Sequence, residues 1–236
     1  MKKNIYLDNL GKRALEASKS IHNLNEKTKN KVLRDYIEII KKNKNKIIKK
    51  NNTDIQKSKD KKIKSSLIDR TILNEQRINS IIKSIYEVIR LKDPCAKVLT
   101  SVKRSNGLRI QKVTMPIGVM GVIYEARPNV TADISILCFK SGNVAILRGG
   151  SEAFNTNTIL SNLFRHVLKK NKINPNCIQL INNTDRSYVD YLLSNMKSYI
   201  DVIIPRGGKS LVAKVLQLST VPVIGHLEGL CHIYID

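Results

Sequence analysis

Apolar residues in the first third of the chain recur at three- and four-residue spacing, the spacing of amphipathic helices. The pattern is clearest over residues 10–21, 32–40 and 74–91. No proline interrupts it before Pro94, which ends the last segment because proline cannot continue a helix. We therefore predict a helical N-terminal region over residues 1–97.

The spacing of apolar residues changes to that of β-structure at Val98. The apolar runs 98–102 and 108–113 flank the turn sequence Ser105-Asn106-Gly107. Asn-Gly between two such runs favours a tight hairpin, because both residues tolerate the positive φ that the turn requires. We predict a β-hairpin over residues 98–114.

Short apolar strands alternate with amphipathic helices in the rest of the chain. The predicted strands are residues 119–124, 144–147, 178–181 and 202–204, and the helices that follow them are residues 130–140, 152–171, 186–195 and 209–218. This alternation indicates parallel βαβ units with right-handed crossovers. The predicted fold class is α/β, with a Rossmann-like parallel sheet in residues 115–225. Residues 221–224 and 232–235 resemble further strands.

Composition argues against membrane and secreted proteins. The 236 residues contain no apolar run long enough for a membrane span, and no apolar stretch follows the basic N-terminus as in a secretory signal. Widely spaced cysteines that form no metal-ligand pair indicate free thiols in an intracellular protein; here they are Cys95, Cys138, Cys177 and Cys231. We predict a cytoplasmic protein with no membrane contact and no metal.

The formal net charge is +23, and residues 1–64 carry 20 lysine and arginine residues against 7 aspartate and glutamate residues. This charge is the one observation that favours a nucleic-acid-binding protein. The basic residues are mostly lysine, and aromatic residues do not interleave with them as stacking platforms for bases. Asparagine and isoleucine, whose codons are A/T-rich like those of lysine, are also frequent there. We interpret the charge as solvated surface and expect no nucleic-acid partner.

The turn Arg148-Gly149-Gly150-Ser151-Glu152 follows a predicted strand and opens a predicted helix. Its glycines would let a ligand approach the backbone, and Arg148 can contact a phosphate. Ser151 is placed to cap the helix, and Glu152 suits the positive end of the helix dipole. The alternative interpretation is a tight turn and a capped helix with no ligand.

Two further turns follow strands in the same way. Pro205-Arg206-Gly207-Gly208-Lys209-Ser210 repeats the arginine-glycine arrangement without forming a Walker A loop. We expect it to lie beside the Arg148 turn at the carboxyl edge of the sheet, where α/β proteins bind ligands. The third turn is Glu125-Ala126-Arg127-Pro128-Asn129, in which Asn129 can donate to a developing oxyanion, cap the next helix, or do both.

We interpret neither Cys138 nor Cys231 as a nucleophile. Cys231 and His232 are neighbours in a predicted strand, so their side chains point to opposite faces and cannot share a hydrogen bond. We interpret Cys231 as a structural thiol, and Cys138, in an apolar helix, as part of the core.

At these turns the chain resembles the γ-glutamyl phosphate reductase (glutamate-5-semialdehyde dehydrogenase) family, relatives of the aldehyde dehydrogenases. The matching segments keep the family's order and spacing along the chain, and they are Val122–Thr131, Lys140–Asn143, Ile146–Glu152, Ile204–Gly208, Ser219–Val223 and Cys231–Asp236. The helical N-terminal region resembles that of the family in the arrangement of its helices more than in amino-acid identity. The resemblance implies the aldehyde dehydrogenase fold.

The resemblance also implies a reaction, in which NADPH reduces γ-glutamyl phosphate to glutamate 5-semialdehyde and phosphate in proline biosynthesis. The cofactor, NADP, would contact Arg148, Gly149, Ser151 and Glu152 near its adenosine ribose and 2′-phosphate. Arg206, Gly207 and Gly208 would lie at its pyrophosphate. Asn129 would line the oxyanion hole, and Glu125 and Arg127 are the candidates for the small-molecule substrate. Homo-oligomers are expected of full-length members.

One departure from the family pattern bears on activity. The family's nucleophilic cysteine lies in a Thr-Gln-Arg-Pro-Ser-Thr-Cys-Asn segment, and the 236 residues contain no such segment. Glu228 is out of register with the general base of broader aldehyde dehydrogenases, and we assign it no role. We expect a chain truncated before the catalytic domain, of which residues 226–236 would be the start.

Three hypotheses stay open. The chain is part of a reductase, or a non-catalytic nucleotide-binding fragment, or a basic nucleic-acid-binding protein. The net charge is the one observation that supports the third hypothesis. Translation of the DNA downstream of Asp236 separates the first from a genuine short protein.

We predict that the 236 residues alone have no reductase activity, because a thioester intermediate requires an activated cysteine. The assay is phosphate-dependent oxidation of glutamate semialdehyde by the pure chain. Measurable turnover would contradict this prediction.

Overall fold

The structure, a computed structural model, describes residues 4–226 and 233–234. Its N-terminal region is helical, as predicted, and consists of α1 (Ile5–Ile21), α2 (Glu26–Lys42), α3 (Lys44–Asp60), α4 (Ser65–Thr71) and α5 (Glu75–Arg90). Asparagine side chains cap three of these helices, accepting backbone N–H groups at the start of α1, α2 and α5. The frequent asparagines therefore have a structural role at Asn4, Asn25 and Asn74.

The apolar pattern does not show α3 and α4 as separate elements. Ile47 is the fully buried apolar residue of α3, and the other buried positions of that helix are the polar residues Asn51, Asp54 and Ser58. A helix whose inner face is polar has no apolar period by which the sequence could reveal it.

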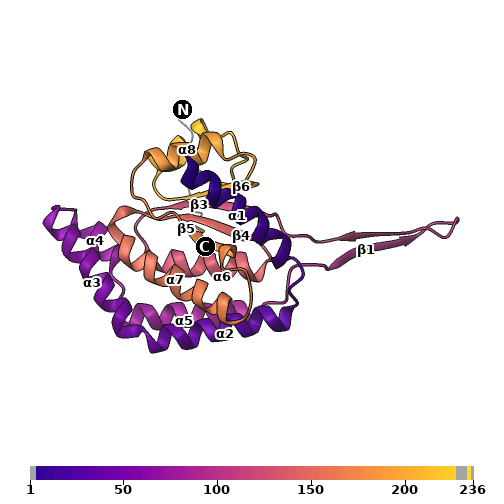
Figure 1. The fold of residues 1–236 in the computed structure, drawn as a ribbon, viewed down its shortest axis with the longest axis horizontal. Coiled ribbons are helices and arrows are strands. Elements are labelled where there is room, and N and C mark those ends of the chain that lie inside the picture. Colours follow the sequence, from indigo (N-terminus) through magenta and orange to yellow (C-terminus); the bar gives the residue numbers. More distant parts are fainter. Residues whose placement is uncertain (1–3, 227–232, 235–236) are drawn as a thin grey trace.

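The central sheet is parallel, with strand order β5-β4-β3-β6. Its strands are β3 (Val119–Tyr124), β4 (Val144–Arg148), β5 (Ile178–Leu180) and β6 (Val202–Arg206), and they alternate with α6 (Pro128–Lys140), α7 (Phe154–Lys170), α8 (Ser187–Asn195) and α9 (Lys209–Leu218). In Figure 1, α6 and α7 cover one face of the sheet with α2 and α5 outside them, and α1 and α8 lie on the other face. All residues of β3 and β4 are consequently buried, as a doubly covered parallel sheet requires.

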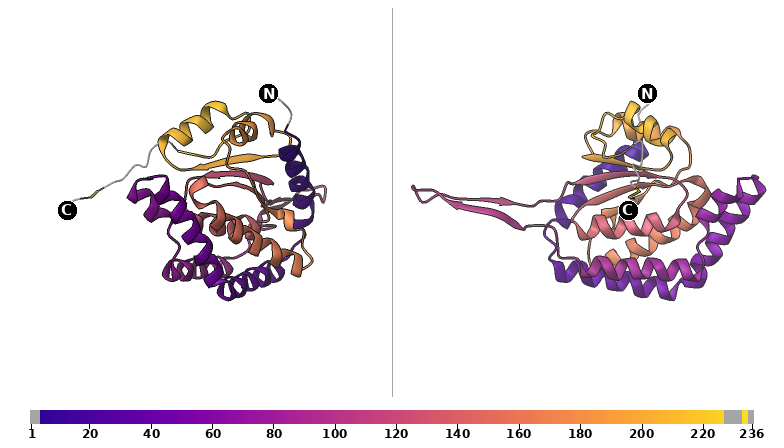
Figure 2. Two further views of the ribbon diagram at one scale, coloured as in Figure 1. Left: turned by 60° about the vertical axis from the view of Figure 1, so that its left-hand side comes forward. Right: turned by 180° about the vertical axis from the view of Figure 1, so that it is seen from behind.

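The hairpin prediction is confirmed. β1 (Val98–Lys103) and β2 (Arg109–Val113) pair antiparallel and project from the rest of the protein, so that every residue of both strands is exposed (Figures 1 and 2). Gly107 has the positive φ, +85°, that the turn sequence predicts.

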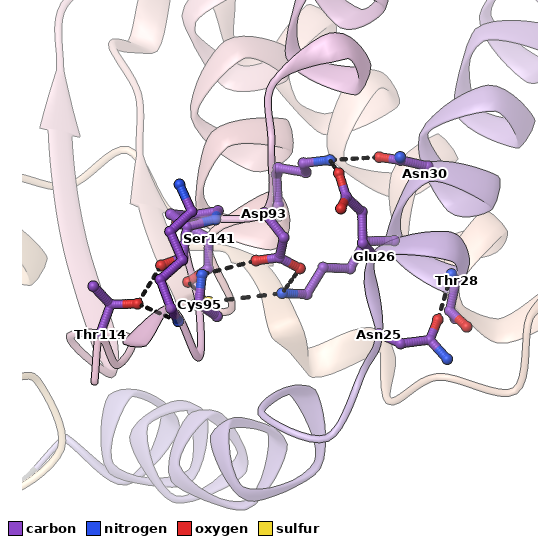
Figure 3. A network of polar contacts seen from close by, with 12 residues as sticks. Asn25, Glu26, Thr28, Asn30, Asp93, Cys95, Thr114 and Ser141 are labelled. Carbon is purple, nitrogen blue, oxygen red and sulfur yellow. Dashed lines mark hydrogen bonds and ion pairs between the residues drawn. The ribbon is translucent and has the colours of Figure 1, made fainter. Parts of the chain in front are cut away.

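A polar network fixes the base of this hairpin (Figure 3). The ammonium of Lys29, buried in α2, lies 2.8 Å from the Asp93 carboxylate, whose other oxygen accepts the Cys95 N–H at 2.9 Å. The Cys95 thiol donates to the carbonyl of Ser141, just after α6, at 3.1 Å. The hydroxyl of Thr114 donates to the Pro94 carbonyl at 2.6 Å. The chain entering and leaving the hairpin is therefore tied to α2 and α6.

Two predicted elements differ in the structure. The helix predicted from Glu152 begins at Phe154, because Ser151–Ala153 forms a 3₁₀ turn in which the Ser151 hydroxyl donates to Glu152 instead of capping the helix. Residues 221–224 form no strand and make only a single parallel bridge, Val223 with Ile203. The strand predicted at 232–235, including Cys231 before it, falls largely outside the described residues. The boundaries at 97, 114 and 225 stay predictions.

Asp54 of α3 supplies the cap that Ser151 does not. Its carboxylate accepts the backbone N–H groups of Asn155 and Thr156 at 3.1 and 2.8 Å, and the Thr156 hydroxyl at 2.7 Å. Only 2% of its surface is exposed. A buried negative charge at the positive end of α7 thus joins the N-terminal helices to the sheet domain.

Replacing Asp54 by alanine leaves two backbone donors without their partner, and we expect it to lower the free energy of unfolding by about 2–3 kcal/mol. Urea denaturation measures this. Asp60→Ala, on the exposed end of the same helix, is the matched control and should change stability by less than about 0.5 kcal/mol. Similar losses for the two variants would contradict the capping role.

Candidate functional site

Three turns meet at the carboxyl edge of the sheet. In the strand register, Ile123 of β3 lies opposite Arg148 of β4 and Pro205 of β6, so the three strands end level with one another. The strand order places β3 between β4 and β6. The expectation that the Arg148 and Arg206 turns lie side by side is therefore wrong, because the turn that follows β3 lies between them.

The middle turn touches both of its neighbours. The backbone N–H of Gly208 donates to Glu125 Oε1 at 2.7 Å. On the other side, a Cβ added to Gly150 would lie 2.9 Å from the backbone nitrogen of Ala126. The three turns thus form one continuous surface across the sheet edge.

A cavity of about 560 Å³ opens on the β4 side of this surface. One wall is apolar and comes from the segment around α4, with Ile63, Leu67 and Ile68. The same cavity is also lined by polar and charged residues, which include Arg148, Ser151, Glu152, Thr184, Arg186, Ser210 and Lys214. A cavity that combines apolar residues with a few charged groups suits a ligand that has a flat ring and anionic groups.

A second cavity of about 710 Å³ lies on the β6 side. Three arginines line it, Arg70 from α4, Arg127 after β3 and Arg206 at the end of β6, together with Gly207 and Gly208. Tyr124 and Glu125 line both cavities and so form the wall between them.

Arg148 is held in place by the backbone around it. Its guanidinium donates to the carbonyls of Gly149 and Thr184 at 2.6 and 2.8 Å, and its buried Nε–H has no partner among the described residues. Burial lowers its pKa, and the nearby Arg186 lowers it further, although Glu152 and Tyr124 oppose the shift. Arg148 is therefore a fixed positive charge in the cavity wall.

The glycines of the two arginine turns have different surroundings. A Cβ on Gly149 would meet the ring of Tyr124 at 2.9 Å and the amide of Asn157 closer still, so Gly149 faces the protein interior. A Cβ on Gly207 would lie 2.7 Å from the carboxyl carbon of Glu125, whereas one on Gly208 would find its nearest neighbour at 3.4 Å. Packing alone accounts for Gly149, and Gly208 lies at the open surface.

Asn129 lies apart from both cavities. It is the second residue of α6 and not its cap, because the helix begins at Pro128 after the extended residue Arg127. Its side-chain amide donates to Asp133 at 3.1 Å and lines a separate hollow of about 340 Å³. The capping interpretation of Asn129 is wrong, and its role in an oxyanion hole stays a prediction.

The three described cysteines are free thiols, as predicted. Burial raises the pKa of Cys138, in the core, and that of Cys177 to about 12 each. Burial also raises the pKa of Cys95, although Lys29 opposes the shift. None of these three is a thiolate at neutral pH, so none is an activated nucleophile. Cys231 lies outside the described residues, as does Glu228.

The sequence did not reveal several residues of the first cavity. Arg186 follows β5, and its position after a strand end is the same signal that identifies Arg148 and Arg206. Lys214, which pairs with Asp190 at 2.6 Å, and the apolar residues around α4 belong to no motif.

Known proteins resemble this chain in sequence and in fold. The chain is 46% identical over 233 residues to the γ-glutamyl phosphate reductase of Clostridium tetani, a match that covers 99% of this chain and 54% of that protein. The chain is homologous to the γ-glutamyl phosphate reductases. It spans about half the length of the curated relatives it matches. A search of protein-family profiles found no match.

Solved structures agree with this relationship. The crystal structure of γ-glutamyl phosphate reductase from Thermotoga maritima matches with a TM-score of 0.89 and 40% identity, over 92% of this chain and 52% of that one. A probable aldehyde dehydrogenase from Listeria monocytogenes matches with a TM-score of 0.71 at 14% identity, over 94% of this chain and 45% of that one. The second match shows the fold alone, and it confirms the predicted aldehyde dehydrogenase fold. No helix in the described part of the chain has the length and apolar character to cross a membrane.

Gly149→Ala should lower the free energy of unfolding by about 1–3 kcal/mol, because its methyl group overpacks Tyr124 and Asn157. Gly208→Ala, in the other turn, meets no close neighbour and should leave stability within about 0.5 kcal/mol of the wild type. Thermal unfolding of the two variants tests the distinction. Equal stability of both would show that Gly149 does not serve packing.

Proposed function

We propose that this chain forms the cofactor-binding part of an NADPH-dependent reductase that converts γ-glutamyl phosphate to glutamate 5-semialdehyde and phosphate in proline biosynthesis. The observation that carries the proposal is the cavity pair at the carboxyl edge of the sheet, built by the same three turns whose sequences resemble the reductases. When bound, the nicotinamide cofactor supplies the hydride. We further propose that the protein acts in the cytoplasm, and as a homo-oligomer when its chain is full length.

The residues at the start of α9 fit a pyrophosphate. The Gly208 N–H already binds one oxygen anion, the Glu125 carboxylate, and the helix dipole adds positive potential there. Gly208 lies at the open surface, the Glu125 carboxylate occupies the space beside Gly207, and Arg206 adds charge beside them. We assign these three residues to the pyrophosphate.

The first cavity fits the adenosine half of the cofactor. Its apolar wall would cover the adenine ring, and Ser151 and Glu152 would bind the ribose. Arg148 and Arg186 place two positive charges in the same wall, close enough to lower the pKa of Arg148. A 2′-phosphate would relieve the repulsion between them, so NADP fits this cavity better than NAD. Gly149 would act only by shaping the turn.

The rest of the second cavity fits the substrate. γ-Glutamyl phosphate carries an acyl phosphate and an α-carboxylate, and beside the residues assigned to the pyrophosphate this cavity contains Arg70 and Arg127, with Glu125 as the single carboxylate among its described residues. Arginine binds phosphate and carboxylate groups in a bidentate manner. Asn129 lines the neighbouring hollow and not this cavity, so it would donate to the developing oxyanion only after its side-chain amide leaves Asp133. The chemistry also needs a thiolate, which none of the three described cysteines supplies.

The protonated state of those cysteines favours a second function for the 236 residues by themselves, which is nucleotide binding without turnover. Under either function the chain binds NADPH. A saturable change in protein or cofactor fluorescence on titration tests this shared requirement, and no saturable binding at millimolar cofactor would overturn both.

Arg186→Gln should weaken NADPH binding about tenfold and leave NADH binding nearly unchanged, because a charged hydrogen bond to the 2′-phosphate is lost. Titration with both cofactors measures the ratio of the two dissociation constants. Arg104→Gln, in the exposed hairpin, removes the same charge far from the cavity and serves as the control. Equal weakening of NADPH and NADH would show that Arg186 does not bind the 2′-phosphate.

A further inference from the structure

The carboxylate of Glu125 occupies the backbone amide that a pyrophosphate would use. Its Oε1 accepts the Gly208 N–H at 2.7 Å. The carboxyl group also fills the space beside Gly207, where an added Cβ would lie 2.7 Å from both the carboxyl carbon and Oε1. A ligand phosphate and this carboxylate therefore cannot bind at Gly208 together.

Glu125 also separates the two cavities, and it is the movable part of that wall. Tyr124, the other residue that lines both cavities, is buried, and its hydroxyl is hydrogen-bonded to Thr131 at 2.6 Å. Glu125 is exposed. Its backbone is fixed, because its N–H donates to the Arg206 carbonyl at 3.1 Å and its carbonyl accepts the Arg127 N–H at 2.7 Å. Only its side chain can turn away.

A Glu125 side chain that turned away from Gly208 would still lie near positively charged residues. The second cavity, whose lining includes both Glu125 and Gly208, is also lined by Arg70, Arg127 and Arg206. A carboxylate that leaves the Gly208 amide can pair there with a guanidinium, and this limits the cost of its displacement.

We propose that the Glu125 carboxylate competes with the cofactor pyrophosphate for the Gly208 amide. The dinucleotide displaces this carboxylate from Gly208 when it binds across the two cavities. The proposal rests on the proposed function, since it takes the first cavity as the adenosine site. Glu125 then lowers the affinity for the whole dinucleotide, whereas a ligand confined to the first cavity leaves the hydrogen bond from Gly208 to Glu125 in place. This differs from the substrate-binding role that the sequence suggests for Glu125.

Two ligands separate these effects. NADPH spans both cavities, whereas adenosine 2′-monophosphate has the same adenine, ribose and 2′-phosphate and no phosphate at the 5′ position. Glu125→Ala should bind NADPH about fivefold more tightly than the wild type, which corresponds to about one ordinary hydrogen bond. Its affinity for adenosine 2′-monophosphate should change much less. Glu125→Gln, which keeps an acceptor oxygen without the charge, should fall between wild type and alanine.

Glu87→Gln, an exposed position on α5, is the control for the change in net charge and should affect neither ligand. Titration of each purified chain with both ligands gives the dissociation constants, and retained affinity for adenosine 2′-monophosphate shows that a variant is folded. Unchanged or weaker NADPH binding by Glu125→Ala would overturn the proposal. If that happens while the wild type still binds adenosine 2′-monophosphate, the proposed function survives. If the wild type binds neither ligand, both fall.

Discussion

β3 is hydrogen-bonded to β4 on one side and to β6 on the other, and each of its residues from Val119 to Tyr124 is buried. The three strands are parallel and end level, so the turns that follow them emerge at one edge. None of the three turns forms a ligand site by itself. The Arg148 turn contributes charge, the Arg206 turn contributes the backbone amide of Gly208, and the turn after β3 lies between them and touches both.

The N-terminal helices complete this edge through polar contacts. Asp54 of α3 caps α7, and Asn51, also on α3, binds the Thr156 hydroxyl and the Leu73 N–H through its side-chain amide. These buried bonds fix α3, and α4 follows it to form the apolar wall of the first cavity. Because a buried polar group is costly when unpaired, the contacts specify one position for α3 against the sheet domain. The basic helical region is thus a structural part of the candidate site.

Elements with a regular apolar pattern could be predicted from the sequence, and they include β3, α9 and the hairpin turn at Gly107. α3 could not, because its inner face is polar. Strand order is also absent from local sequence, so the neighbouring position of the Arg148 and Arg206 turns was predicted wrongly. Ser151 has the residue type of a helix cap, but the carboxylate of Asp54, about a hundred residues earlier in the chain, binds the same helix end with two backbone bonds.

The net charge of the chain says little about the charge at the candidate site, which depends on where individual charged residues lie. Lys29 and Lys140 are buried in ion pairs with Asp93 and Glu26 at the base of the hairpin, so their charges are neutralised locally. Surface lysines are screened by salt within about 10 Å. The field at the sheet edge therefore comes from guanidinium groups at short range, with Arg148 fixed by two carbonyls. The Glu125 carboxylate lies in that field in direct contact with the Gly208 amide, so under the proposed function it acts on a bound anion without the screening that weakens distant lysines.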